Sequence, residues 1–266
     1  MSDPAAVRFR ATLHYDGTAF HGWQLQPDRR TVQGELEARL ARLFDRPARA
    51  HGAGRTDTGV HAVGQEIAFE SPPGWSADEL RRALNATLPD DVWVEKLSPA
   101  GEGFHPRFSA TGRRYEYVVS VGEDAASPVR RGRMWAHGAV SDPEALGRAA
   151  ALAVGERHFE VFAKAGQPER GTRCRVEEAD WSRTAGGDLR FLVVADRFLH
   201  RMVRYLVAAM MDVAGGRRSL DELASMLDGD TTHRPPEPAP ACGLYLSGVR
   251  YDAWNRPPGI PGFPAA

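Results

Sequence analysis

The order of strands and helices most constrains how this chain can fold, because the same order is predicted twice. Residues 7–15 alternate apolar and polar side chains, which is typical of a half-buried strand. Residues 31–44 place apolar side chains at helical spacing behind Thr31, a good N-cap residue. The rest of the first half is predicted as a strand near 46–50, a strand at 63–69, a helix at 76–84 capped by Ser76, and a strand at 92–97.

The second half repeats this β-α-β-β-α-β order and adds one helix. Its predicted elements are a strand at 113–121, a helix at 142–154 capped by Ser141, strands at 173–182 and 189–195 joined by a turn at 185–188, helices at 198–214 and 220–227, and a strand at 244–251. Units of this order place their helices on one face of an antiparallel sheet. We therefore predict an α+β fold of two such halves with a cleft between them. The duplication rests on element order, because the sequence itself shows no clear repeat.

Two segments are predicted to be irregular. Residues 229–243 contain four prolines and are expected to form a long loop. Residues 255–266 are rich in proline and glycine and are expected to form a loose tail.

The composition gives no global sign of a nucleic-acid partner. Of the 266 residues, 42% are hydrophobic, and the formal net charge is −1. An RNA-binding surface would therefore have to come from local clustering of basic residues. Lysine occurs only at Lys96 and Lys164, and the other basic residues are arginines. This composition fits RNA binding and a GC-biased genome equally well.

Cysteine usage and hydropathy argue against two other kinds of chain. Cys174 and Cys242 are far apart and form no CxxC pair, so a disulfide framework or a cysteine zinc site is not expected. The N-terminus has no charged-then-apolar leader, and no run approaches the roughly 18 apolar residues that a membrane span needs. A soluble, cytoplasmic protein is expected.

The segment 51–62 is the most informative part of the sequence. It lies between a predicted helix and a predicted strand, where functional loops tend to occur, and its glycines allow tight turns. Asp57 is flanked by Arg55, Thr56 and Thr58, and such neighbours favour an ionised carboxylate that can act as a nucleophile or a base. The alternative is an Asx turn, in which the Asp57 side chain bonds only its own backbone.

Four histidines in the first half raise the question of a metal site. They form no HxxxH pair on a helix, and no cysteine accompanies them, so no metal site is expected. These histidines are His14, His21, His51 and His61.

Residues 55–62, Arg-Thr-Asp-Thr-Gly-Val-His-Ala, closely resemble the catalytic-loop motif of the TruA family of tRNA pseudouridine synthases. Thr58 stands where that motif usually has alanine. Further stretches match the same family in the same order, from about residue 15 to residue 251. They are 15–24, 30–37, 85–92, 104–108, 114–117, 198–204 and 241–246.

The resemblance implies roles for three residues in the chemistry. Asp57 matches the family's nucleophilic aspartate. Tyr115 matches the tyrosine that packs on the flipped base, and base stacking contributes about 1–3 kcal/mol. Arg204 matches the arginine that pairs with the catalytic aspartate. From the residues alone, Tyr115 could equally be an inward strand residue, and Arg204 could lie on a solvated helix face.

The resemblance also implies substrate-binding residues around this centre. Leu244 is expected to wall the uracil pocket, although a strand leucine can also be ordinary core. Arg55 is expected either to contact the RNA near the flipped nucleotide or to hold the loop. Thr56 and His61 complete the expected substrate-binding set.

The fold implied is the pseudouridine synthase fold, α+β, with two ferredoxin-like halves, a shared and mainly antiparallel sheet, and a positively charged central cleft. Residues 1–110 would carry the Asp57 loop, residues 111–254 would carry the other site residues, and residues 255–266 would be a flexible tail. The implied substrates are uridines 38–40 in the tRNA anticodon arm. The family uses no cofactor and no catalytic metal, and its bacterial members are homodimers.

A set of arginines outside the site is expected to face RNA phosphates, because RNA contact there should be electrostatic and shape-led. The set consists of Arg29, Arg30, Arg107, Arg113, Arg114, Arg130, Arg131, Arg133, Arg217 and Arg218.

Some departures from the family pattern put substrate contacts in doubt more than the chemistry. Ala208 replaces a usual glycine, His158 replaces a usual aspartate, and the loop 164–172 lacks the usual cysteine. Two other classes of function stay open. One is an RNA-binding protein that has lost the chemistry, although it would be expected to lack Asp57. The other is a carboxylate-dependent hydrolase, which usually needs a second carboxylate that the Asp57 loop does not offer.

Overall fold

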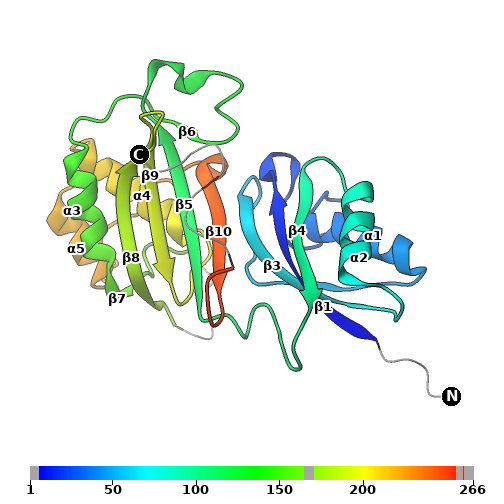
Figure 1. Ribbon diagram of the computed structural model, residues 1–266. Coiled ribbons are helices and arrows are strands. Elements are labelled where there is room, and N and C mark those ends of the chain that lie inside the picture. Colours follow the sequence, from blue (N-terminus) through cyan, green and yellow to red (C-terminus); the bar gives the residue numbers. More distant parts are fainter. Residues whose placement is uncertain (1–5, 165–170, 256–259, 261–266) are drawn as a thin grey trace. The chain divides into compact units, whose positions relative to one another are not determined.

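The computed structural model describes residues 6–164, 171–255 and 260, and its fold is mixed α+β with a large, mainly antiparallel sheet (Figure 1). The chain divides into two compact units. The first comprises Met1–Thr111 and Leu246–Pro258, and the second comprises Gly112–Tyr245 and Gly259–Ala266. None of the described helices is long and apolar enough to cross a membrane.

The first unit confirms the predicted β-α-β-β-α-β order. Its elements are β1 (Val7–Tyr15), α1 (Val32–Phe44), β2 (Ala50–Gly52), β3 (His61–Ser71), α2 (Ala77–Thr87) and β4 (Val92–Pro99). The strands run antiparallel in the order β4-β1-β3, and β2 pairs with β3. Leu13 of β1 and Leu36, Leu40, Leu80 and Leu84 of the two helices are fully buried in its core. Figure 1 shows both helices together beside these strands.

The predicted helix starts in this unit are confirmed at atomic level. The Thr31 hydroxyl accepts a hydrogen bond from the Gly34 N–H (3.2 Å). Ser76 forms a reciprocal capping box with Glu79 at the start of α2. The strand predicted near 46–50 was misplaced, because β2 begins at Ala50. Pro47 has no N–H to give to a strand ladder, which explains why pairing starts later.

The second unit contains the predicted elements and two short additional strands. Its elements are β5 (Gly112–Ser120), β6 (Trp135–Ala136), α3 (Glu144–Ala153), β7 (Gly155–His158), β8 (Arg173–Arg183), β9 (Leu189–Ala195), α4 (Met202–Ala214), α5 (Leu220–Leu227) and β10 (Leu244–Arg250). The strands β5, β9, β8 and β7 are antiparallel neighbours in that order. The first two residues of β10 belong to this unit, and from Leu246 the chain returns to the first unit.

Two helix starts in the second unit differ from the prediction. The helix expected from residue 198 begins at Met202, because Arg201 adopts a left-handed conformation (φ 66°) that a helix cannot include. Ser141 does not cap α3. Instead, the Asp142 carboxylate accepts a hydrogen bond from the Ala145 N–H (3.1 Å).

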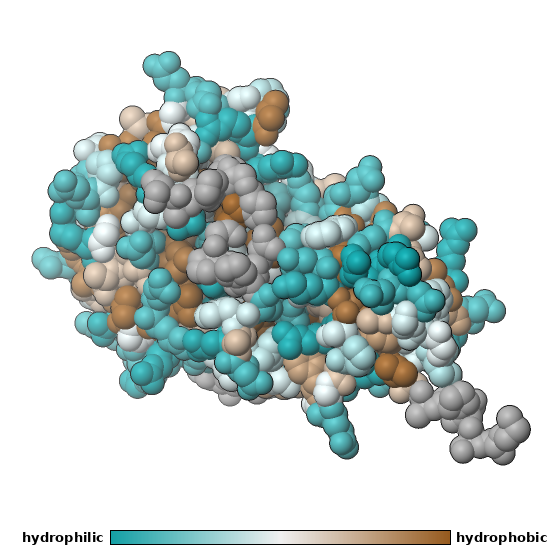
Figure 2. All heavy atoms as spheres, in the orientation of Figure 1, coloured by the Kyte–Doolittle hydropathy of each residue, from teal (hydrophilic) through white to brown (hydrophobic). Residues whose placement is uncertain are grey.

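The expected tail begins with a well-anchored residue. The Asn255 side chain accepts from the Val249 N–H (2.8 Å) and donates to Glu66 (2.8 Å). Residues 256–259 and 261–266 lie outside the described part of the chain, as do residues 165–170 of the loop 164–172. Figure 2 shows hydrophilic side chains over most of the visible surface of each unit, with hydrophobic ones scattered between them.

We predict that Asp142→Ala lowers the free energy of unfolding by about 1 kcal/mol, because it removes the cap of α3. The neighbouring substitution, Ser141→Ala, should change the free energy of unfolding by less than about 0.5 kcal/mol. Urea unfolding followed by circular dichroism measures both variants. Equal losses in the two would mean that Asp142 is not the cap.

Candidate functional site

Asp57 lies at the turn of the loop that connects β2 to β3. Its side chain is partly exposed, while Thr56 on one side and Val60 beyond it are buried. The Val60 N–H donates to the Asp57 carbonyl oxygen (3.1 Å) and closes the turn. Gly59 takes a left-handed conformation (φ 78°), which glycine adopts without strain. The loop therefore presents a carboxylate from a backbone that is tightly turned.

Hydrogen bonds hold the loop on both sides of Asp57. The Thr56 and Tyr15 hydroxyls share a hydrogen bond of 2.8 Å, and the Thr56 carbonyl oxygen accepts from the Trp23 N–H (3.0 Å). The Gly59 N–H donates to the Phe20 carbonyl oxygen (3.3 Å). The end of β1 and the segment 20–23 thus fix the backbone before and after the carboxylate.

The segment 17–23 packs against the loop so closely that two of its positions require glycine. A Cβ atom at Gly17 would lie 2.0 Å from the Val60 carbonyl oxygen. A Cβ atom at Gly22, which has φ 85°, would lie 2.7 Å from the Thr56 carbonyl oxygen. Both glycines fall in the stretch 15–24 that the sequence had singled out, and their role is to let the two backbones touch.

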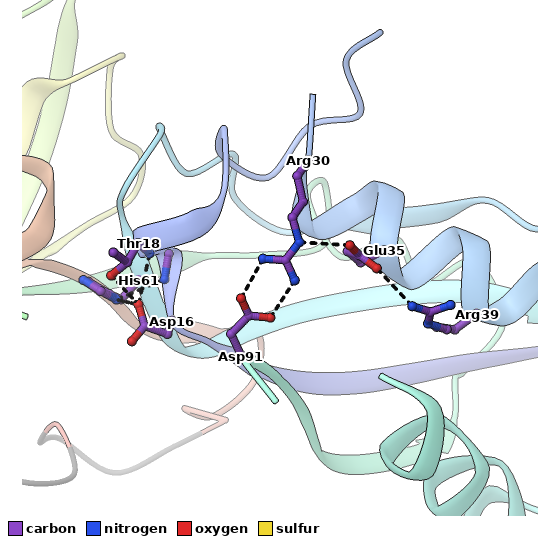
Figure 3. Close-up of polar contacts among 8 residues, drawn as sticks. Asp16, Thr18, Arg30, Glu35, Arg39, His61 and Asp91 are labelled. Carbon is purple, nitrogen blue, oxygen red and sulfur yellow. Dashed lines mark hydrogen bonds and ion pairs between the residues drawn. The ribbon is translucent and has the colours of Figure 1, made fainter. Parts of the chain in front are cut away.

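His61 is buried beneath the same turn and contacts Asp16 (Figure 3). Its Nδ1 atom accepts from the Gly17 N–H (3.1 Å) and lies 3.3 Å from the Asp16 carboxylate. Asp16 also accepts from the Thr18 N–H (3.0 Å) and hydroxyl (2.6 Å). These interactions, His61 first among them, hold the pKa of Asp16 well below its ordinary value of 3.8.

Arg30 forms an ion-pair network with Asp91 and Glu35 (Figure 3). Its guanidinium makes two hydrogen bonds to Asp91 (2.7 and 2.9 Å) and one to Glu35 (3.0 Å). It also lies 4.1 Å from the ring centroid of Phe20, a cation–π contact. The bonds to Asp91 raise the pKa of Arg30. Arg30 was expected to face phosphate, and its side chain, which is 35% exposed, forms ion pairs with Glu35 and Asp91.

In the second unit, Tyr115 lies on β5 opposite Val193 of β9. Its ring is 9% exposed and meets Phe198 edge-on, with centroids 4.9 Å apart. Tyr117, two residues along the same strand, donates its hydroxyl to the Pro240 carbonyl oxygen (2.6 Å). Burial raises the pKa of Tyr117 well above its ordinary value. Tyr115 is therefore the less enclosed of the two phenols.

Arg204 of α4 is held by the proline-rich loop 229–243. Its Nε–H donates to the Ala239 carbonyl oxygen (2.6 Å), and the Ala239 N–H donates back to the Arg204 carbonyl oxygen (3.1 Å). Burial raises the pKa of Cys242, and the charge of Arg204 opposes that shift. Leu244, which follows this loop at the start of β10, is 6% exposed. The loop thus fixes both Arg204 and the residues that precede Leu244.

The predicted site residues fall into two groups, one in each unit. Asp57, Arg55, Thr56 and His61 belong to the first unit, where Arg55 is exposed and the last two are buried. Tyr115, Arg204 and Leu244 belong to the second unit. Sequence reasoning did not find the residues that hold each group, chiefly Tyr15, Arg30 and Ala239, since their contacts join positions 35 to 61 residues apart.

The arginines expected to face phosphate differ in what they contact. Arg114 is only 2% exposed, Arg130 pairs with Asp188 (2.6 Å) and Arg217 pairs with Asp212 (2.7 Å). Four others are clearly exposed, namely Arg29, Arg107, Arg131 and Arg133. The prediction of a surface arginine is wrong for Arg114, because β5 turns that side chain inward.

Comparison with known proteins gives consistent matches along the chain. A family model described as tRNA pseudouridine synthase matches residues 11–109 and 149–252. The tRNA pseudouridine synthase A of Solidesulfovibrio magneticus is 40% identical over 97% of this chain and 94% of that protein. The proteins of the same name from Chlorobaculum tepidum and Bacillus subtilis are 40% and 37% identical over 90% and 92% of this chain, and these matches cover 96% and 100% of those proteins.

We predict that Asp16→Asn, which keeps the shape of the side chain, destabilises the protein only where Asp16 is ionised. Because its pKa is lowered in the folded protein, the carboxylate stabilises the fold above pH 3.8, and this contribution is lost as the pH falls below that value. The stability difference between wild type and variant should be present at pH 6 and shrink toward pH 2. Urea unfolding across this range measures it, and a pH-independent difference would contradict the assignment.

Proposed function

Because the chain belongs to the tRNA pseudouridine synthase family, and is therefore an isomerase that converts uridine in tRNA to pseudouridine, we propose that its targets are uridines 38–40 and that Asp57 is the catalytic carboxylate. The observation that carries the assignment of Asp57 is the anchoring of its loop. Hydrogen bonds to Thr56 and Gly59 fix the backbone on both sides of a partly exposed carboxylate. A catalytic group held in this way loses little freedom when the substrate binds.

The reaction needs a positioned carboxylate more than an additional reagent. The N-glycosidic bond breaks, the uracil turns, and a carbon–carbon bond forms to the same sugar, so no group enters or leaves. Asp57 would attack the sugar, attack the base, or remove a sugar proton, and each route requires it to be ionised. The target base must first leave its stack, which costs a few kcal/mol.

The second unit would supply the partners of the flipped base and of the carboxylate. Tyr115 packs on the uracil in this proposal, and its phenol helps with the proton that is lost from carbon after rejoining. Arg204 pairs with Asp57, and Ala239 orients its guanidinium for that purpose. Leu244 walls the uracil pocket, and Arg55 contacts the RNA beside it. The protein would act in the cytoplasm as a homodimer, like the family members that it resembles.

Asp57→Asn should lower the rate of pseudouridine formation at positions 38–40 of an unmodified tRNA by at least about a thousandfold. The amide is neither a nucleophile nor a base at neutral pH. Binding of the tRNA should stay within about threefold of wild type. Pseudouridine mapping and a filter-binding titration measure the two quantities.

The matched control for this variant is Asp45→Asn, at an exposed left-handed C-cap that asparagine tolerates. It should behave as wild type. A wild-type protein that binds tRNA without converting it would instead favour an RNA-binding protein. Conversion at other positions would keep the chemistry and refute the target assignment.

Tyr115→Phe should keep tRNA binding and slow conversion by about 10²-fold or more, because it keeps the stacking ring and removes a proton-transfer group. Tyr117→Phe makes the same change two residues away, at a hydroxyl already committed to Pro240. The Tyr117→Phe substitution should lower the free energy of unfolding and have a smaller effect on the turnover rate. Single-turnover rates at saturating tRNA compare the variants, and equal rates for Tyr115→Phe and wild type would exclude a role for the phenol.

A further inference from the structure

A patch of aromatic and basic side chains lies on the first unit, outside the Asp57 loop. It consists of His51 of β2 and His105, Arg107 and Phe108 of the segment that follows β4. The His51 and His105 rings lie 5.3 Å apart, and the His105 and Phe108 rings lie 4.4 Å apart. The Arg107 guanidinium is 5.8 Å from the Phe108 ring centroid. Phe108 is 68% exposed, a large fraction for a phenylalanine.

The turn that carries Phe108 is held in place by its own hydrogen bonds. The Nδ1 atom of His105 accepts from the N–H groups of Arg107 (3.1 Å) and Phe108 (3.4 Å). Ser109 donates its N–H to the His105 carbonyl oxygen (2.9 Å), and its hydroxyl accepts from the His105 N–H (3.0 Å). The Tyr251 hydroxyl donates to the Pro106 carbonyl oxygen (2.9 Å). Phe108 is therefore presented to solvent from a fixed backbone.

The patch suits a flat, anionic ligand. Burial first, and then the charges of His51, Arg8 and Arg107, lower the pKa of His105, so its imidazole is a neutral aromatic ring at neutral pH. A neutral imidazole and a phenyl ring offer faces on which a nucleobase can stack. The neighbouring guanidinium groups attract phosphate. A protein partner with an acidic, aromatic surface would match less closely, because nothing in the patch forms an apolar groove.

The position of the patch separates it from the reacting carboxylate. His51 pairs with Ala68 of β3, seven residues beyond His61, where the Asp57 loop enters that strand. Six residues of chain join His51 to Asp57, so their Cα atoms lie no more than about 20 Å apart. The patch shares no residue with the Asp57 loop, so a nucleotide of the same tRNA other than the reacting uridine would occupy it.

We propose that Phe108, together with His51, His105 and Arg107, forms a platform on which an unpaired nucleotide of the tRNA stacks, away from the uridine that reacts. Arg107 contacts the phosphate of that nucleotide. This inference rests on the proposed function, since it takes tRNA as the ligand. Because the platform residues lie outside the Asp57 loop, the binding energy of the platform affects how tightly tRNA is held and leaves the reaction step unchanged.

The test compares Phe108→Leu, which keeps an apolar side chain without a ring, with Phe108→Tyr, which keeps the ring. In the Asp57→Asn background, which prevents turnover, Phe108→Leu should weaken binding of unmodified tRNA by about 5- to 100-fold, and Phe108→Tyr should bind within about twofold of its parent. With Asp57 intact, the single-turnover rate at saturating tRNA should be the same in both. Arg107→Gln should reduce the salt dependence of binding by about one phosphate contact.

Trp93→Leu is the matched control. Trp93 is 46% exposed and meets His14 edge-on at 5.1 Å, but it lies on β4, which β1 and β3 separate from β2. This variant should bind tRNA as its parent does. Equal weakening by Trp93→Leu, unchanged binding in Phe108→Leu, or a slower single-turnover rate without weaker binding would each overturn the platform.

Two further outcomes separate the possible failures. Dissociation of a protein oligomer by Phe108→Leu in sedimentation, with tRNA binding unchanged, would assign the patch to contacts between copies of the chain and would overturn the platform. The titrations require only that tRNA binds. If the wild-type protein binds tRNA but does not convert it, the proposed function fails. The comparison of the Phe108 variants still tests whether the platform binds tRNA.

Discussion

The pair of hydrogen bonds at Thr56 is the constraint on which the first unit's site depends. The Thr56 side chain is tied to Tyr15 at the end of β1, and its carbonyl oxygen is tied to Trp23. Thr56, the residue that precedes Asp57, is therefore tied both to the sheet and to the segment 20–23. Because a bond between a buried hydroxyl and its partner is costly to leave unmade, the loop is held more firmly than its glycine content suggests.

Other residues of the first unit hold the Asp57 loop in place through further contacts. Arg30 stacks on Phe20, whose carbonyl oxygen receives the Gly59 N–H, and the same guanidinium is fixed by Asp91 and Glu35. The turn ends at His61, which is buried and contacts Asp16 (3.3 Å). These contacts join the Asp57 loop, the segment 16–20, β3 and α1. The position of the carboxylate consequently depends on the packing of the whole unit.

The elements that sequence reasoning predicted correctly follow local rules, and those that it missed depend on contacts distant in sequence. Ser76 and Glu79 are three residues apart, so their capping box is visible in the sequence. Arg30 carries a charge that the sequence reveals, but Asp91, which neutralises it, is 61 residues away. The start of α4 was missed because the apolar pattern continues through Arg201, whose left-handed backbone no pattern of side chains indicates.

Positioning is also the common property of the two groups of site residues. Arg204 and Ala239 exchange hydrogen bonds in the second unit much as Thr56 and its partners do in the first, so in each unit a loop is fixed to a regular element beside a charged side chain. An isomerisation that adds and removes no group leaves a protein little to contribute except the placement of charge and of the base. A fold that uses its polar contacts to hold two such loops provides this placement. A stacking platform outside the Asp57 loop would add affinity without changing the residues that hold either loop.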